Sequence, residues 1–167
     1  MASFTLSDAG GAHLATLLKA QAVFHLAMGS GDPSWSVGAP AEDAAATALQ
    51  AEFGRREALA VEYAQEDGGG IYSIDGRGSW SATPTPTRHL LIHFQCDLTN
   101  GVGQAVRELA IYMNTTRQGG VPAGQKFLRP ADIDDPGIRL AVLHPDSAGY
   151  ITLDGVNRYQ LYYLHSF

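Results

Sequence analysis

Two histidines and the only cysteine of the chain lie close together, and all three are residue types that bind metal ions. His89 and His93 are four residues apart in the stretch HLLIHFQC, and Cys96 follows three residues later. The stretch alternates apolar and polar residues, which is typical of a half-buried β-strand. Successive strand residues point to opposite faces, so Cys96 points away from both histidines. The three side chains cannot converge on a tetrahedral ion, and the sequence predicts no metal site here.

Other catalytic and cofactor-binding patterns are missing from the sequence. GSGD, at 29–32, lacks the Lys-Ser/Thr pair of a phosphate-binding loop, and no serine stands in a G-x-S-x-G turn. Cys96 belongs to an apolar strand face, which suits packing better than nucleophilic catalysis. The aspartates at 132, 134 and 135 lack the glycine and the distant glutamate of a calcium loop. We therefore expect no enzyme activity and no cofactor.

An adjacent pair of opposite charges interrupts a second apolar stretch, AVRELAIYMN, at 105–114. Alternation puts Arg107 and Glu108 on opposite faces, each among apolar side chains, so each charge needs a partner of its own. The alternative is an edge strand whose charged groups reach water. The candidate partners are Arg55 or Arg56 for Glu108, and Glu52 or Glu57 for Arg107.

Aromatic residues crowd the last ten positions, RYQLYYLHSF. As a strand, this stretch carries large apolar side chains on both faces. An exposed apolar surface of that size commonly marks an interface, and the other interpretation is a central strand buried on both faces. The interface candidates are aromatic side chains: Tyr159, Tyr162, Tyr163 and Phe167, with Trp35 from an earlier loop.

Hydrophobic periodicity predicts the elements that must position these residues. Residues 7–19 begin with a capping residue and repeat leucines at helical spacing. Residues 41–53, AEDAAATALQAEF, are rich in alanine with acids in the first turn, which predicts a second helix. Later stretches alternate with period two, and 89–98 and 104–114, joined by the turn TNGVG, are expected to form a hairpin. The predicted fold class is α+β: two N-terminal helices with a mainly antiparallel β-sheet of about six strands.

The composition of the chain limits its number of domains and the classes of partner that it can bind. With 167 residues, 45% of them hydrophobic, we expect a single domain over 1–167. Glycines and prolines in EDGGG and SATPTPT bracket a hairpin arm that could project over 66–87. The net charge of -6 argues against a nucleic-acid partner, and no apolar run approaches the ~18 residues of a membrane span. A lone cysteine is typical of a protein made in a reducing cytoplasm.

Three short motifs carry a resemblance to a known family. They are a strand ending in glycines, a Leu-x-x-Glu-x-x-Arg segment, and a strand with an Arg-Glu pair followed by aliphatic and aromatic residues. The matching residues are Ala27, Gly29 and Gly31; Leu49, Glu52 and Arg55; and Arg107, Glu108, Leu109, Ile111 and Tyr112. Together these stretches resemble the N-terminal, tail-attached domain of bacteriophage tail-fibre and baseplate proteins.

The resemblance implies a structural component of a phage tail baseplate or a related contractile injection apparatus, with a role in attaching tail fibres. Its implied partners are other tail and baseplate proteins, the tail fibre and copies of itself, and its implied location is the virion tail after synthesis in the host cytoplasm. The alternative function is a small β-rich module that binds a ligand or carbohydrate. Convergence of Trp35, Trp80 and several tyrosines in one exposed cleft would favour that alternative.

Overall fold

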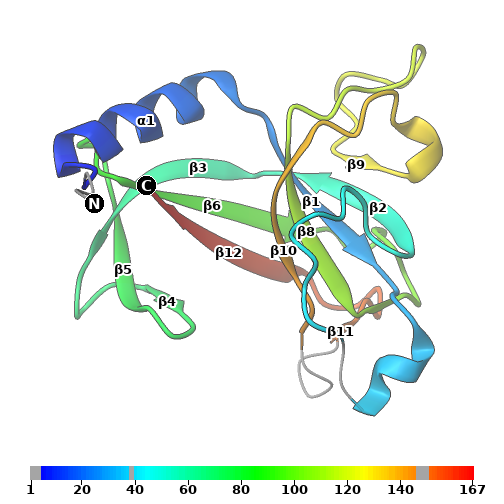
Figure 1. The fold of residues 1–167 in the computed structure, drawn as a ribbon. Helices are drawn as coiled ribbons and strands as arrows, with labels where there is room; N and C mark the ends of the chain where they lie inside the picture. Colours follow the sequence, from blue (N-terminus) through cyan, green and yellow to red (C-terminus); the bar gives the residue numbers. More distant parts are fainter. Residues whose placement is uncertain (1–4, 38–39, 146–150) are drawn as a thin grey trace. The chain divides into compact units, whose positions relative to one another are not determined.

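The computed structural model describes residues 5–37, 40–145 and 151–167 (Figure 1). The described residues contain one α-helix and twelve strands in three sheets, so the predicted α+β fold with two helices and about six strands is wrong. The chain forms two compact units. Of the described residues, unit 1 comprises 5–22, 59–94 and 161–167, and unit 2 comprises 23–37, 40–58, 95–145 and 151–160. The single domain stays a prediction.

Unit 1 is a sheet with one helix packed on it. Its five-stranded sheet has the order β12-β6-β3-β5-β4. The strands β6 and β12 each extend from one unit into the other. The elements are α1 (Asp8–Gln21), β3 (Ala60–Glu66), β4 (Tyr72–Ile74), β5 (Gly78–Thr83), β6 (His89–Cys96) and β12 (Tyr159–Ser166).

The helix α1 is the first of the two predicted helices, and its start follows from the sequence. The Ser7 hydroxyl accepts a hydrogen bond from the Gly10 amide at 3.1 Å, which caps the first turn. Alternation along β3 and β6 then builds a core on each face of the sheet. Ala15 and Leu18 of α1 pack on Tyr63, Leu90, Val61 and Phe167, and the opposite face of the sheet holds Ala64, Trp80, Leu91 and Leu164.

The predicted arm at 66–87 contains the strands β4 and β5 of unit 1. The antiparallel pairing of β5 with β3 places Trp80 opposite Glu66. The Trp80 side chain is buried in the core of the unit, where its indole N–H donates to the Arg77 carbonyl at 2.8 Å. Projection of the remaining hairpin from the body stays a prediction.

Unit 2 is built on a second five-stranded sheet, with the order β10-β8-β1-β2-β9, and a small sheet of β11 and β7. The central strand β1 is buried at all six residues and its neighbour β8 at five of six. The strands of unit 2 are β1 (Phe24–Gly29), β2 (Glu52–Glu57), β7 (Ala105–Val106), β8 (Glu108–Met113), β9 (Phe127–Leu128), β10 (Ile138–Leu143) and β11 (Ile151–Thr152). Two short 3-10 helices, η1 (Pro33–Val37) and η2 (Pro130–Asp132), complete it.

The predicted helix at 41–53 is absent, because contacts with the sheet hold this segment in another conformation. Residues 40–51, which we call the strap, contain turns and bends and lead directly into β2. Leu49 packs with Ala27, Ala110 and Tyr112 of the sheet, and the Tyr112 hydroxyl donates to the Thr47 carbonyl at 2.9 Å. These contacts outweigh the modest helix propensity of alanine, which is a weak determinant against tertiary packing.

The expected hairpin of 89–98 with 104–114 is also wrong. β6 pairs with β3 in unit 1, whereas β8 pairs with β1 and β10 in unit 2. Both strands are largely buried, so the backbone N–H and C=O groups along both edges of each strand need hydrogen-bond partners. Strands from distant parts of the chain supply these partners.

Candidate interaction site

Glu108, at the start of β8, is a deeply buried carboxylate with 1% of its surface exposed. Its Oε2 accepts a hydrogen bond from the Gln50 amide at 2.9 Å, and its Oε1 accepts one from the Ala51 amide at 2.6 Å. Gly29 lies opposite Glu108 in the β1–β8 register, and a Cβ at Gly29 would stand only 2.6 Å from the Glu108 Cδ. The bare backbone of Gly29 therefore makes room for a carboxylate that ties the strap to the sheet.

The ion pair predicted for Glu108 is wrong. Arg55 pairs with Glu52 at 2.6 Å, and Arg56 pairs with Asp97 at 3.0 Å. The prediction assumed that both arginines follow the end of a helix. They lie instead on β2, whose alternation turns Arg55 and Arg56 to opposite faces.

The acids proposed for Arg107 have other partners. Glu52 is paired with Arg55, and Glu57 is paired with Arg117 and Lys126. Arg107 donates from Nη1 to the Ser30 carbonyl at 3.0 Å. The two charges of the Arg-Glu pair thus both contact backbone groups of neighbouring segments.

Arg55 is buried on one face of the unit 2 sheet, where it packs on the Tyr112 ring. Its guanidinium lies 3.7 Å from the centroid of the Tyr112 ring and donates to the Thr115 hydroxyl at 3.0 Å and the Pro136 carbonyl at 2.6 Å. Burial raises the pKa of Tyr112, and the Arg55 charge opposes this shift. A cation over an aromatic face is attractive where water is excluded, so this layer stabilises the sheet.

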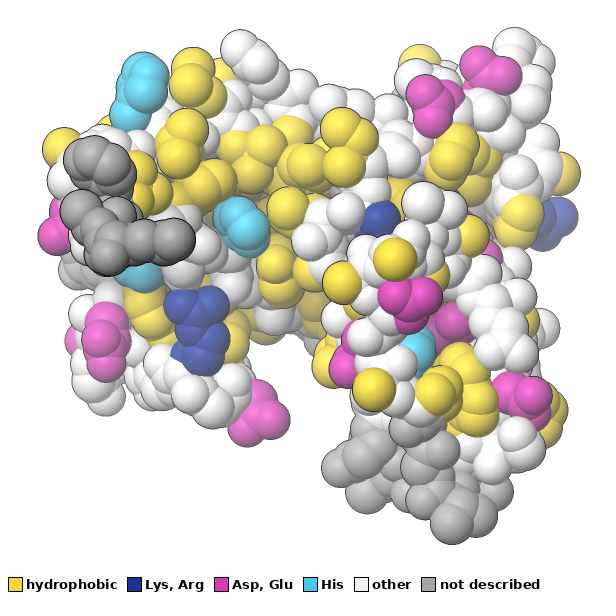
Figure 2. Space-filling model, viewed as in Figure 1, with side chains coloured by type: hydrophobic (Ala, Val, Ile, Leu, Met, Phe, Trp, Pro, Cys, Tyr) yellow, Lys and Arg dark blue, Asp and Glu magenta, His cyan; other side chains and the backbone are white. Residues whose placement is uncertain are grey.

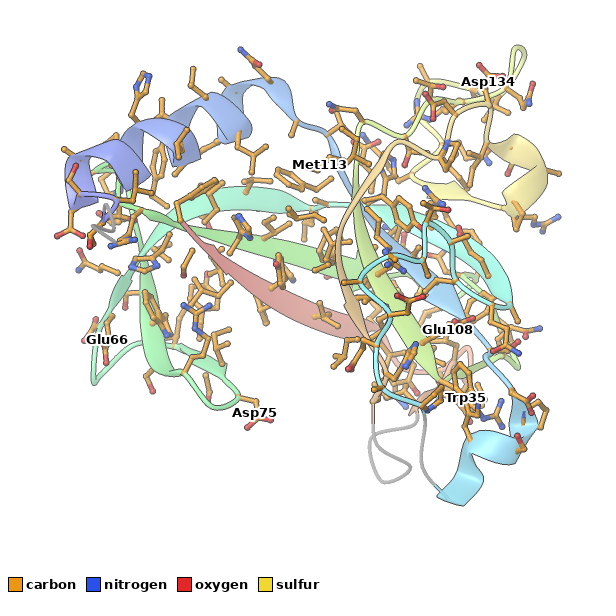
Figure 3. All side chains as sticks on the ribbon, in the orientation of Figure 1. Trp35, Glu66, Asp75, Glu108, Met113 and Asp134 are labelled. Carbon is orange, nitrogen blue, oxygen red and sulfur yellow. The ribbon has the colours of Figure 1, made fainter. Side chains whose placement is uncertain are left out.

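A pocket lies beside His25 on the same face of the unit 2 sheet. The β1 register places His25 opposite Tyr112 on one side and Glu57 on the other. Glu108 and Met113 mark the two ends of β8 in Figure 3, and the pocket lies past the Met113 end. We call this cavity of about 580 Å³ the His25 pocket; it is lined by Val23, His25, Glu57, Asn114, Thr115, Thr116, Arg117, Ala123 and Lys126.

Positive charge exceeds negative charge in the His25 pocket. Glu57 accepts from Arg117 Nη2 at 2.8 Å and also from the Lys126 ammonium. Arg117 additionally donates from Nη1 to the Ala123 carbonyl at 2.7 Å, which orders the loop around it. Two cations thus share one carboxylate, leaving a surplus positive charge beside the cavity.

His25 forms part of the lining of this pocket and is 2% exposed. Within the described part of the chain, neither of its ring nitrogens has a hydrogen-bond partner. Burial lowers the pKa of His25 to about 4; Glu57 opposes this shift, while Arg55, Arg117 and Lys126 reinforce it. The imidazole is therefore neutral at pH 7. Sequence reasoning missed His25, although a lone histidine inside the apolar run FHLAMG was the available signal.

Comparison with known proteins identifies the family. Residues 1–150 match the family model described as "Baseplate wedge 3 tail fiber network component". The chain belongs to this family. It is a structural component of the bacteriophage tail baseplate and works with other baseplate and tail fibre proteins. The resemblance to phage tail-fibre and baseplate proteins is thus confirmed. No curated protein matches the sequence.

The aromatic interface candidates of this baseplate component are half-buried side chains with contacts inside their own units. In unit 1, Tyr162 stacks on His93 with ring centroids 4.4 Å apart, and Phe167 packs in the core beneath α1. Tyr163 hydrogen-bonds the His165 ring at 3.2 Å. In unit 2, the Tyr159 hydroxyl donates to the Thr152 carbonyl at 2.8 Å, and Trp35 lies 5.0 Å from the His144 ring. A role at an interface stays a prediction for all five.

The three residues first considered as metal ligands each have another neighbour. His89 Nδ1 lies 2.7 Å from the Ser166 hydroxyl, and His93 stacks on Tyr162. Cys96 contacts the Met28 sulfur at 3.5 Å, and burial raises the pKa of its thiol to about 11. No three His, Cys, Asp or Glu residues of the described ranges are grouped so that they could hold a metal ion. None of the described helices has the length and apolar character to cross a membrane.

Proposed function

We propose that this baseplate component attaches the tail fibre to the baseplate wedge through protein–protein interfaces and catalyses no reaction. The observation that carries the proposal is the family match over residues 1–150, because its description names both the wedge and the tail fibre network. An adaptor needs at least two surfaces that bind different neighbours. Unit 1 offers the exposed leucines of α1, and unit 2 offers the charged His25 pocket.

The surface of unit 1 is apolar at α1. Leu14 and Leu17 lie on the outer side of the helix with 41% and 42% of their surface exposed. Figure 2 shows hydrophobic side chains at the surface along this helix. Exposed apolar side chains that gather in one patch favour a contact with a protein partner. A second copy of the chain is one such partner, and light scattering on the purified protein measures that self-association directly.

Phage particles that lack this protein test the adaptor role. We expect such particles to carry assembled baseplates without tail fibres, seen by electron microscopy, and we expect fibres to return when the gene is supplied in trans. Particles that lack the protein yet carry their full set of fibres would refute the attachment role.

The carbohydrate-binding alternative loses the feature that would have favoured it. That alternative requires Trp35 and Trp80 to line an exposed cleft, but Trp80 is buried in the core of unit 1. We therefore retain one proposed function.

A further inference from the structure

The His25 pocket combines three features that do not follow from the needs of the fold. It contains a buried imidazole without a partner, a surplus positive charge, and a cavity of about 580 Å³. Pockets that bind small groups in proteins commonly span roughly 300 to 1,000 Å³. Buried polar atoms are nearly always hydrogen-bonded, so an exception points to a ligand or to function.

The charges around His25 decide which chemistry suits the pocket. The charged groups that act on the ring are Glu57 of β2, Arg55 of β2, and Arg117 and Lys126 of the loop between β8 and β9. Arg55 is neutralised by Glu52. Glu57 balances only one of the two remaining cations, so the pocket favours an anion.

We propose that the His25 pocket binds a carboxylate group, carried by an acidic side chain or the C-terminus of a neighbouring baseplate or tail fibre protein. A second carboxylate would pair with Arg117 and Lys126 and restore the charge balance that Glu57 alone leaves incomplete. Arginine and lysine bind carboxylates through short, charge-assisted hydrogen bonds. This inference rests on the proposed function for the identity of the partner, but not for the chemistry of the pocket.

His25 is a lining residue of the pocket that carries a hydrogen-bond donor at every pH. A neutral imidazole carries one N–H group and an imidazolium carries two. Leaving such a group unpaired in the interior destabilises a protein, so we expect the carboxylate to supply the hydrogen bond that the buried ring nitrogens lack. The same property separates a binding role from a structural one, because replacement of an unpartnered polar group should not destabilise the fold.

The pocket is set in a rigid frame. Asn114 adopts a left-handed conformation with φ of 59°, and its side-chain oxygen accepts from the Val23 amide at 3.0 Å. The Asn114 amide donates to the Val23 carbonyl at 2.8 Å, which closes the frame. On the other side of the pocket, the loop between β8 and β9 is tied to the segment between η2 and β10. The amide of Asp134, which is labelled in Figure 3 and belongs to that segment, donates to the Thr116 carbonyl at 3.1 Å. A preorganised frame lowers the ordering cost of binding.

The experiment titrates the full chain with glutarate, a small dicarboxylate, and follows the His25 ring and Arg117 side-chain signals by NMR. We expect saturable shifts in the millimolar range. Lys126→Gln and His25→Phe should each weaken glutarate binding at least threefold. Arg129→Gln, which removes an exposed cation outside the pocket, should leave binding unchanged. Lys126 is half exposed, so its replacement leaves the fold intact.

His25→Phe has a second readout. The melting temperature should stay the same or rise, because the substitution removes two unpartnered nitrogens while keeping an aromatic ring. A large fall in melting temperature together with unchanged glutarate binding would overturn the role of His25.

Two outcomes would overturn the carboxylate assignment itself. One is the absence of saturable shifts with glutarate, and the other is tighter binding of inorganic phosphate than of glutarate. The titration needs no partner protein, so its failure is distinct from a failure of the adaptor role, which is measured by the fibres on particles that lack the protein. If the pocket binds glutarate and the partner docks there, Lys126→Glu phage should lose fibres or baseplate integrity. Particles that keep both would refute docking at this pocket.

Discussion

The two hydrogen bonds that Glu108 accepts from the strap lead to a quantitative prediction about the stability of the protein. Replacing Glu108 with glutamine keeps the shape but turns one carboxylate oxygen into an NH₂ group. This group would face the amide of Gln50 or Ala51, which each donate to the carboxylate in the native protein. Hydrogen bonds to charged groups are worth about 1.5 to 3 kcal/mol, and a buried donor left unpaired costs a similar amount. We expect Glu108→Gln to lower the free energy of unfolding by about 2 to 4 kcal/mol.

Gly29→Ala tests the same contact from the opposite strand. Its Cβ would approach the Glu108 side chain within 2.6 Å of Cδ, and the strap prevents that side chain from moving away. Overpacking of a core typically costs about 1 to 3 kcal/mol. In a Glu108→Ala background the obstructing atoms are gone, so Gly29→Ala should cost much less. The double-mutant cycle should therefore show a coupling of roughly 1 to 3 kcal/mol.

Urea unfolding of the single and double variants measures the free energies, and amide hydrogen exchange at Gln50 and Ala51 reports on the strap itself. Matched controls are Gly68→Ala, where an added Cβ meets no atom within 4 Å, and Glu66→Gln on the exposed end of β3. A loss below about 0.5 kcal/mol for Glu108→Gln, the scale of an exposed charge contact, would refute the reasoning. So would a cycle in which the effects of Gly29→Ala and Glu108→Ala simply add.

Three further predictions concern other parts of the chain. The pKa of His25 is about 4 in the folded protein against about 6.5 for an ordinary exposed histidine, so the unfolded chain binds more protons between these values. Stability should therefore fall as the pH drops from 6.5 to 4, by about 3 kcal/mol in urea titrations, and His25→Phe should remove that part of the pH dependence. Deletion of 159–167, which contains β12, should abolish cooperative melting of unit 1 by circular dichroism, since a large buried side chain such as Leu164 contributes about 1.5 to 3 kcal/mol. Treatment with EDTA should leave the melting temperature unchanged, and a large decrease would revive a structural metal site.

The sequence alone determined the features that depend on near neighbours. The Ser7 cap and the leucine spacing predicted α1, and period-two alternation predicted the strands that became β6 and β8. Short motifs around Gly29, Arg55 and Glu108 were enough to indicate the phage baseplate family.

Tertiary structure decided the features that depend on distant residues. The alanine-rich segment became the strap because Glu108, which lies 57 residues after Ala51, captures its amide. The same contact replaced the expected ion pair, since a carboxylate that accepts two backbone N–H groups is already satisfied. The place of His25 in a charged pocket also depends on distant residues, because Arg117 and Lys126 of the loop between β8 and β9 line the same pocket. Local propensity amounts to a few tenths of a kcal/mol per residue, whereas a buried hydrogen bond to a charged group is worth about 1.5 to 3 kcal/mol, so the long-range contacts prevail where the two conflict.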